Sequence, residues 1–171
     1  MDTLAIIPAR GGSKGLPRKN LADLGLIEAL TEEIMYRKKP FLGICLGMQL
    51  LAKSSEEHGH TVGLGLIDSQ IKKFSISGNK YKIPHVGWND ITLNNNEGVL
   101  HTLQTGKTYY FVHSYYMENS QSKDVLATCE YGEVFTAAIK KDNIFATQFH
   151  PEKSGKFGIN ILRKFFTEFI N

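Results

Sequence analysis

A cysteine between two glycines is the first feature of the sequence that could carry chemistry. The segment Gly43-Ile44-Cys45-Leu46-Gly47 begins at the end of the apolar run Pro40–Ile44, which predicts a strand, and precedes a predicted helix at Met48–Lys53. This order is typical of a nucleophile elbow, a tight and strained turn in which side chains at the glycine positions would clash. The helix would also favour the thiolate form of Cys45. The alternative is a buried structural cysteine.

A histidine and a glutamate near the C-terminus could complete such a site. His150-Pro151-Glu152 directly follows the predicted strand Ile144–Phe149, and catalytic residues of open α/β sheets gather at strand ends. If the chain stays extended, His150 and Glu152 project to the same side. The carboxylate could then orient the imidazole, which could deprotonate Cys45. The alternative is a surface histidine beside an ordinary acid.

The remaining cysteine and two further histidines do not indicate another site. Cys129 lies inside a β-like run without flanking glycines, so we expect it to be structural. His58 and His60 share a glycine-containing loop with no further set of ligands nearby. Two cysteines do not make a disulfide framework. We therefore expect no metal, no cofactor and reduced thiols.

The composition limits the classes of protein to which the chain can belong. Its 171 residues fit one globular domain, and 42% hydrophobic and 22% charged residues allow a buried core. The formal net charge of +3 is too small, and the positive residues too scattered, to indicate nucleic-acid binding. The most apolar stretch, Pro40–Ala52, is too short to span a bilayer, and the N-terminus does not resemble a signal peptide. We expect a soluble, cytoplasmic domain without membrane or nucleic-acid partners.

Apolar periodicity predicts alternating helices and strands, which is typical of an α/β domain. Helical spacing predicts helices at Leu26–Arg37 and Ile159–Ile170. Short β-like runs predict further strands at Leu4–Ile7, Ile67–Phe74, Tyr81–Ile83, Tyr109–Val112, Val125–Cys129, Thr136–Ile139 and Ile144–Phe149. The sequence contains no internal repeat.

Four segments together resemble the class I, triad-type glutamine amidotransferases. They occur in the order of that family and are GICLGMQLL (Gly43–Leu51), IPHVGWN (Ile83–Asn89), YFVHSYY (Tyr110–Tyr116) and ATQFHPEKSG (Ala146–Gly155). The elbow and the HPE motif are shared by the whole class. The two middle segments are similar to those of the glutaminase subunits of imidazole glycerol phosphate synthases. The resemblance covers residues 26–171, which we expect to form the glutamine amidotransferase domain.

The resemblance implies the chemistry of a cysteine glutaminase. Cys45 would attack the carboxamide of glutamine and form a glutamyl thioester as ammonia leaves. His150 would act as general base and then as general acid, and Glu152 would orient it. The backbone N–H of Leu46 would be one donor to the oxyanion.

The substrate-binding residues of the family also have counterparts here. Gln49 would contact the substrate, and Glu57 would receive its α-amino group. The backbone of His113, Ser114 and Tyr115 would line the substrate pocket.

The fold and the partner follow from the same resemblance. The implied fold is a flavodoxin-like parallel sheet flanked by helices. The implied partner, in a heterodimer, is a (β/α)8-barrel cyclase that receives the ammonia. His85, Gly87, Trp88 and Asn89 belong to a segment that resembles the interface with this barrel. Trp88 would be an anchor of the interface, and a buried core tryptophan is the alternative.

Residues 1–25 resemble a different family. The strand, helix and glycine loop that open the amidotransferases, and that supply a second oxyanion donor, are truncated or replaced. AIIPARGGSKGLPRKN (Ala5–Asn20) is similar to the start of acylneuraminate-type cytidylyltransferases, where such a loop holds the triphosphate of CTP. The matching positions are Arg10, Gly11, Gly12, Ser13, Lys14 and Lys19. Because the rest of that enzyme is absent, we expect no CTP binding, and instead either a basic tail or a surrogate first strand followed by a loop.

The function implied is hydrolysis of glutamine to glutamate and ammonia for a cyclase in histidine biosynthesis. Two alternatives are a truncated, poorly active glutaminase-like binding module and a paralogue that supplies ammonia for amidation of surface sugars. Because no second oxyanion donor is recognised, we expect weak or no activity from the chain as written. A family-type opening grafted onto Leu26–Asn171 should restore it.

Overall fold

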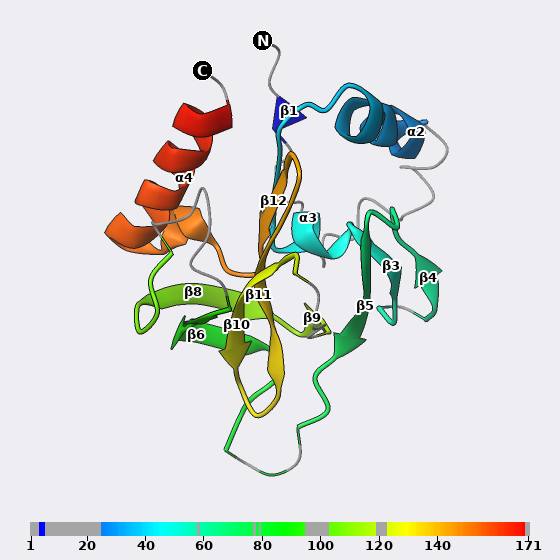
Figure 1. The fold of residues 1–171 in the computed structure, drawn as a ribbon. Helices are drawn as coiled ribbons and strands as arrows, with labels where there is room; N and C mark the ends of the chain where they lie inside the picture. Colours follow the sequence, from blue (N-terminus) through cyan, green and yellow to red (C-terminus); the bar gives the residue numbers. More distant parts are fainter. Residues whose placement is uncertain are drawn as a thin grey trace.

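The centre of the molecule is a six-stranded mixed sheet with the strand order β1-β2-β12-β11-β10-β7 (Figure 1). The computed structural model describes residues 4–5, 25–57, 59–76, 78, 80–94, 103–118 and 123–169. Strands β1 (Leu4–Ala5), β2 (Phe41–Ile44) and β12 (Ile144–Thr147) are parallel neighbours. The antiparallel strands are β11 (Val134–Lys141), β10 (Val125–Glu130) and β7 (Thr92–Leu93). The sheet is thus parallel, as the resemblance implied, only over its three strands β1, β2 and β12.

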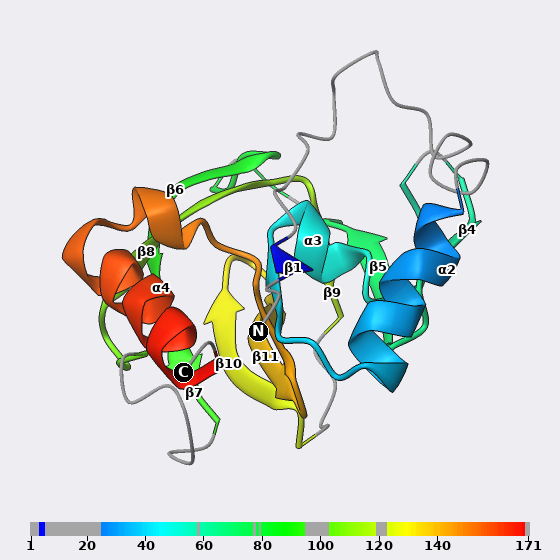
Figure 2. The ribbon, with the colours of Figure 1, turned by 90° about the horizontal axis from the view of Figure 1, so that it is seen from above.

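Helices lie on both sides of this sheet, as expected for an α/β domain (Figure 2). On one side, helix α2 (Leu26–Thr31) continues into a π-helical segment, η1 (Glu32–Tyr36). On the other side lies α4 (Gly155–Phe169). Because side chains alternate along a strand, Phe41 of β2 packs in the cluster of η1, whereas Leu42 packs in the cluster of α4. The sequence predicted both helices, although the second half of the first one is π-helical rather than α-helical.

Two smaller sheets complete the fold. Strands β4 (Thr61–Val62), β3 (Ala52–Ser55), β5 (Ile67–Lys73) and β9 (Tyr115–Met117) form one sheet in that order. Strands β6 (His85–Asp90) and β8 (Thr108–His113) form an antiparallel pair. In this pair His85 lies opposite His113, so the segment of the expected partner interface directly adjoins the expected substrate pocket.

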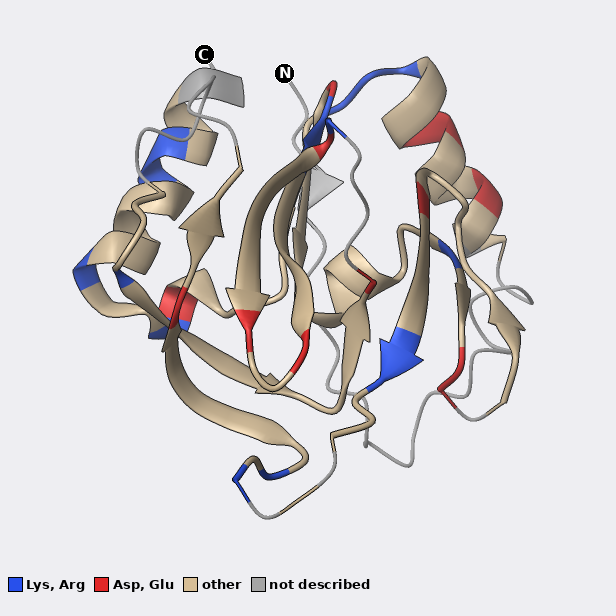
Figure 3. Ribbon diagram, turned by 60° about the horizontal axis from the view of Figure 1, so that its bottom comes forward, with Lys and Arg blue, Asp and Glu red and all other residues tan. Residues whose placement is uncertain are grey.

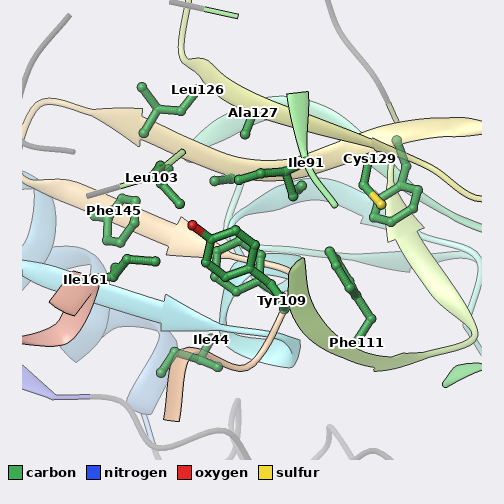
Figure 4. Close-up of a cluster of buried hydrophobic side chains, with 14 of the residues drawn as sticks. Ile44, Ile91, Leu103, Tyr109, Phe111, Leu126, Ala127, Cys129, Phe145 and Ile161 are labelled. Atoms are coloured by element: carbon green, nitrogen blue, oxygen red, sulfur yellow. The ribbon is translucent and has the colours of Figure 1, made fainter. Parts of the chain in front are cut away.

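The larger hydrophobic core lies between the main sheet, α4 and the β6–β8 pair. Figure 4 shows Tyr109 and Phe111 from β8 packed with Phe145 from β12 and Ile161 from α4. Each of these four side chains is at most 1% exposed. Burying one large apolar side chain stabilises a fold by roughly 1.5–3 kcal/mol, so this core ties β8 firmly to the main sheet.

Two predicted elements differ in the structure. The helix predicted at Met48–Lys53 is the single turn α3 (Leu46–Gln49), because Ala52–Ser55 pairs with β5 as a strand. The prediction of a strand at Tyr81–Ile83 is wrong, because these residues belong to no strand. The Tyr131 hydroxyl accepts from the N–H of Lys82 at 3.1 Å and donates to its carbonyl at 3.0 Å, and so replaces a neighbouring strand.

The N-terminal segment contributes a strand to the main sheet. Leu4 lies opposite Phe41 and Ala5 opposite Leu42 in parallel register. Of the two expectations for this segment, the structure therefore supports the surrogate first strand, with Leu4–Ala5 on the edge of β2. The rest of the predicted strand, Ile6 and Ile7, and the basic loop lie outside the described residues.

Charged residues of both signs are spread over several helices, strands and loops (Figure 3). This distribution matches the scattered charge of the sequence. Within the described residues, no helix is both long enough and apolar enough to cross a membrane.

Candidate active site

Cys45 sits in a strained turn at the end of a buried strand. It follows β2 directly and has φ 52° and ψ −105°, which is an unusual conformation for a residue with a side chain. Such strain costs about 1–3 kcal/mol and persists only where the surroundings hold it. The backbone N–H of Cys45 donates to the carbonyl of Thr147 at 2.7 Å, which anchors the turn to β12. The predicted nucleophile therefore has the backbone geometry of an elbow.

The two glycines of the elbow have different roles. A Cβ at Gly43 would lie 2.9 Å from the carbonyl carbon of Gly47 and 3.0 Å from the Cβ of Ala146. A side chain at Gly43 would therefore clash, as predicted. For Gly47 the same prediction is wrong, because a Cβ there would meet no atom of the described residues within 4 Å.

His150 and Glu152 lie at the same end of the sheet as Cys45. Ile44 and Thr147 are partners in the parallel pair β2–β12, so the residues that follow them are neighbours. His150 is only 8% exposed, and its Nδ1 lies 2.7 Å from Oε1 of Glu152. The chain does not stay extended as supposed, since Pro151–Lys153 forms the 3₁₀ turn η2, yet this turn still brings the carboxylate to the imidazole.

The resting sulfur is a thiol. Burial raises the pKa of Cys45 to about 11, and the negative charges of Glu152 and Glu57 act in the same direction. A hydrogen bond from the Leu46 N–H and the charge of Lys153 lower this pKa, but they are outweighed. The Leu46 N–H at the start of α3 favours the thiolate as expected, but burial outweighs it, so the net shift in pKa favours the thiol. Attack by Cys45 therefore needs a base.

A glutamine that the sequence interpretation missed contacts the predicted nucleophile. Gln148 is fully buried, and its Nε2 donates to Sγ of Cys45 at 3.6 Å. Oε1 of Gln148 accepts from Nε2 of Gln49 at 3.0 Å, and Nε2 of Gln49 also donates to the carbonyl of Tyr115 at 2.8 Å. The position of Gln148, one residue beyond the last pair of β12, is the signal that could have identified it.

The predicted substrate-binding residues lie around this cluster. The carbonyl of Tyr115 accepts from Gln49 and also from Nδ1 of His113 at 2.8 Å, so both of its lone pairs are used. The carbonyl of Ser114 accepts from the Phe74 N–H at 3.2 Å. Glu57 is half-buried beyond β3, and its charge acts on the Cys45 thiol. Hydrogen bonds through Gln148 therefore connect Gln49, Tyr115 and His113 to the sulfur of Cys45.

The predicted interface segment divides into an inner and an outer face. His85 is 2% exposed and forms a buried pair with His113, with 3.1 Å between its Nδ1 and Nε2 of His113. Gly87 and Asn89 lie on this inner face and are half-buried, and Asn89 donates to the carbonyl of Glu130 at 3.0 Å. Trp88 is 56% exposed, which excludes the alternative of a buried core tryptophan.

The two buried histidines are neutral near pH 7. Burial lowers the pKa of His113 to about 3 and that of His85 to about 4. The carbonyl of Tyr115 can only accept, so the proton of neutral His113 is on Nδ1. Nε2 of His113 then accepts, and Nδ1 of His85 donates to it.

Cys129 has the surroundings of a structural residue. It is 2% exposed in the core of Figure 4, and burial raises the pKa of its thiol to about 12. In the part of the chain that the structure describes, no three His, Cys, Asp or Glu side chains are grouped so that they could hold a metal ion.

Known proteins are similar to this chain in sequence. The family model for "Glutamine amidotransferase class-I" matches residues 17–169. The chain is 48% identical to imidazole glycerol phosphate synthase subunit HisH 2 of Methanococcus maripaludis, over 85% of this chain and 71% of that protein. It is 43% identical to subunit HisH of Leptospira interrogans, over 95% of this chain and 80% of that protein.

Solved structures share the fold at low sequence identity. The structure of PurLQS from Thermotoga maritima matches with a TM-score of 0.64 at 20% identity, over 97% of this chain and 82% of that chain. A glutamine amidotransferase structure from the same organism matches with a TM-score of 0.61 at 16% identity, over 96% of this chain and 61% of that chain. By sequence and by fold, the chain belongs to the class-I glutamine amidotransferase family.

Proposed function

We propose that this chain is the glutaminase subunit of an imidazole glycerol phosphate synthase. It hydrolyses glutamine to glutamate and ammonia and passes the ammonia to a cyclase subunit. The observation that carries this proposal is the strained elbow of Cys45 at the strand end next to the His150–Glu152 pair. The relatives at 48% and 43% identity, both named as HisH subunits, support the pathway. Two free cysteines fit action in the cytoplasm, where thiols stay reduced.

The first half of the reaction forms a thioester. The carboxylate of Glu152 holds the proton of His150 on Nδ1, so Nε2 takes the proton of the Cys45 thiol. The sulfur attacks the carboxamide carbon of glutamine, and the Leu46 N–H donates to the oxyanion that develops. The tetrahedral intermediate then breaks its C–N bond while His150 returns the proton to the departing ammonia.

The second half releases glutamate. Nε2 of His150 takes a proton from a water molecule, and the resulting hydroxide attacks the thioester carbon. The C–S bond breaks, the proton on His150 returns to the sulfur of Cys45, and the thiol is restored. The overall balance is glutamine plus water giving glutamate plus ammonia.

The ammonium group of the substrate binds to oxygen acceptors near the sulfur. Glu57 supplies a carboxylate whose charge already acts on Cys45. Gln49 uses both N–H bonds of its amide within the protein, so only its Oε1 is available to the substrate. The Tyr115 carbonyl already accepts from two donors and is excluded as a ligand, so the rest of the His113–Tyr115 backbone lines the pocket.

The cyclase barrel docks on the outer face of β6. Val86 and Trp88 lie two residues apart on the strand and are 55% and 56% exposed. The Trp88 ring packs edge-on against Tyr110 at 6.0 Å, and Nζ of Lys153 lies 5.8 Å from the centre of the Tyr110 ring. Exposed aromatic residues of this kind are typical anchors of interfaces, and Lys153 follows the His150–Glu152 pair directly.

Glutamine hydrolysis in complex with the cyclase tests the proposal. We would measure glutamate and ammonia with the chain as written and with Leu26–Asn171 carrying a family-type opening, each with and without the barrel. We expect equimolar glutamate and ammonia, released faster with the barrel, and a higher rate from the grafted chain, because the opening adds a second oxyanion donor. Cys45→Ser should abolish all turnover. The proposal is contradicted if the Cys45→Ser variant keeps the rate, or if neither chain releases glutamate.

A further inference from the structure

We propose that Gln148 is a positioning residue for Cys45, whose side-chain amide holds the sulfur with an N–H donor and directs the thiol proton away from itself. The inference rests on the proposed function and adds to it a residue outside the Cys45–His150–Glu152 set. It is carried by a chain of hydrogen bonds that runs from a backbone carbonyl to the sulfur.

The backbone of Gln148 is fixed on both sides. Its N–H donates to the carbonyl of Ala137 on β11 at 2.9 Å. The preceding residue, Thr147, accepts the N–H of Cys45 at 2.7 Å. Gln148 and Cys45 are therefore held side by side at the ends of neighbouring strands, and the fully buried Gln148 side chain has no route to solvent.

The Tyr115 carbonyl determines the orientation of two amides. Since a carbonyl only accepts, the nitrogen of the Gln49 amide must be the atom 2.8 Å away from it. That nitrogen donates its second proton to Gln148, so the atom of Gln148 that faces Gln49 must be its oxygen. Nε2 of Gln148 is then the atom that faces Sγ of Cys45 at 3.6 Å. The sulfur therefore meets a donor and not an acceptor.

This arrangement acts on both forms of the thiol. The neutral sulfur accepts from the Leu46 N–H and from Gln148, so its own proton must point away from both donors. When the sulfur ionises, both hydrogen bonds become stronger, because charged acceptors bind donors more tightly. The charged groups that act on this sulfur are Glu152 and Glu57, which oppose ionisation, and Lys153, which favours it. Gln148 adds a neutral donor that stays in place at every pH.

A merely structural role for Gln148 makes the opposite experimental prediction. If the side chain only fills space, its loss loosens the site, and a reagent should reach Cys45 faster. If the side chain stabilises the thiolate, its loss leaves less thiolate, and the reagent should react more slowly. The rate of alkylation separates the two roles without requiring glutamine turnover.

The test is alkylation of the full chain by iodoacetamide at pH 8, with the modified peptide followed by mass spectrometry. The variant Gln148→Met keeps the length of the side chain but removes the donor. We expect Cys45 to react about threefold more slowly, because loss of thiolate is partly offset by the greater nucleophilicity of a more basic sulfur. The matched control Thr136→Val also removes a hydrogen bond from a fully buried side chain, and it should leave the rate unchanged. An equal or faster rate in Gln148→Met would overturn the proposal.

Cys129 reports whether each variant is folded. At 2% exposure it should stay unmodified in the native protein. If Gln148→Met exposes Cys129, the alkylation rate of Cys45 is measured in Gln49→Met instead. This variant frees the Gln148 amide to turn its oxygen toward the sulfur. A slower reaction of Cys45 in Gln49→Met supports the inference, and an equal or faster one overturns it. Neither result affects the assignment of Cys45 as nucleophile, which glutamine hydrolysis tests separately.

Discussion

The carboxylate of Glu152 lies 2.7 Å from Nδ1 of His150. Because a carboxylate only accepts, this contact keeps the imidazole proton on Nδ1 and leaves Nε2 as the base. The two residues are two positions apart in the sequence, and their contact depends on the turn η2. In this turn the N–H of Lys153 donates to the carbonyl of His150 at 3.0 Å. The orientation of the base is thus built into one short segment.

Removal of the base should affect turnover more than removal of its partner. We expect His150→Ala to lower kcat for glutamate release by about 10²–10⁴, the usual range for a general base, and Glu152→Ala to lower it less. The measurement is kcat of each variant in complex with the cyclase, made in the grafted chain that carries a family-type opening. Full activity of His150→Ala would remove His150 from the mechanism.

The two elbow glycines should differ in their tolerance of a methyl group. At Gly43 a Cβ would meet the Gly47 backbone at 2.9 Å, so Gly43→Ala should lower the free energy of unfolding by about 1–3 kcal/mol. Gly47→Ala is the matched control, since no described atom lies within 4 Å of its Cβ. Urea unfolding of both variants measures the difference. Equal stability of the two would show that the close approach at Gly43 is not a constraint.

Acid should destabilise the fold through the buried histidine pair. The ordinary pKa of 6.5 falls to about 3 for His113 and to about 4 for His85 upon burial. Between the folded-state pKa values and 6.5, the unfolded chain binds more protons than the folded chain. The contribution of the two neutral histidines to stability is therefore fully present above pH 6.5 and is lost as the pH falls. Each histidine contributes at most about 1.4 kcal/mol per pH unit to this loss. In urea unfolding between pH 6 and 4.5, His85→Phe should therefore show a shallower slope, and an unchanged slope would contradict the assignment.

The exposed tryptophan should dominate binding of the barrel. Trp88→Ala should raise the Kd for the cyclase subunit by about 30-fold, as loss of an interface anchor does. The control is Val62→Ala, an exposed apolar residue on β4 in a different sheet. Titration calorimetry measures both variants. If Val62→Ala weakens binding as much as Trp88→Ala, the docking face lies elsewhere.

Local motifs of the sequence were sufficient to predict the strands that lead to Cys45 and to His150, but not the helix after the elbow. The apolar run before Cys45 is the strand β2, and the run before His150 contains β12, because buried parallel strands have continuous apolar sequences. Their adjacency also follows from the family resemblance. Those features depend on residues close in sequence, or on motifs whose order is characteristic of the family.

Features that depend on contacts distant in sequence could not be predicted in this way. Gln148 contacts Gln49, which is 99 positions away, and its place at a strand end marks it as a candidate without indicating this contact. The pKa of Cys45 is decided by burial, which depends on the assembled fold and outweighs the local effect of the helix. The segment Tyr81–Ile83 has β-like composition, but the hydroxyl of Tyr131 bonds to both backbone groups of Lys82 in place of a neighbouring strand.

Labelling by a glutamine analogue tests the central claim, that Cys45 is the glutaminase nucleophile, most directly. A diazo-ketone analogue of glutamine places an electrophilic carbon where the carboxamide binds, and it needs no complete turnover. In the complex with the cyclase, peptide mapping should find one label per chain, on Cys45, and excess glutamine should prevent it. Cys129, buried in the core, should stay unlabelled. Labelling of Cys129 alone, or of both thiols equally, would contradict the account.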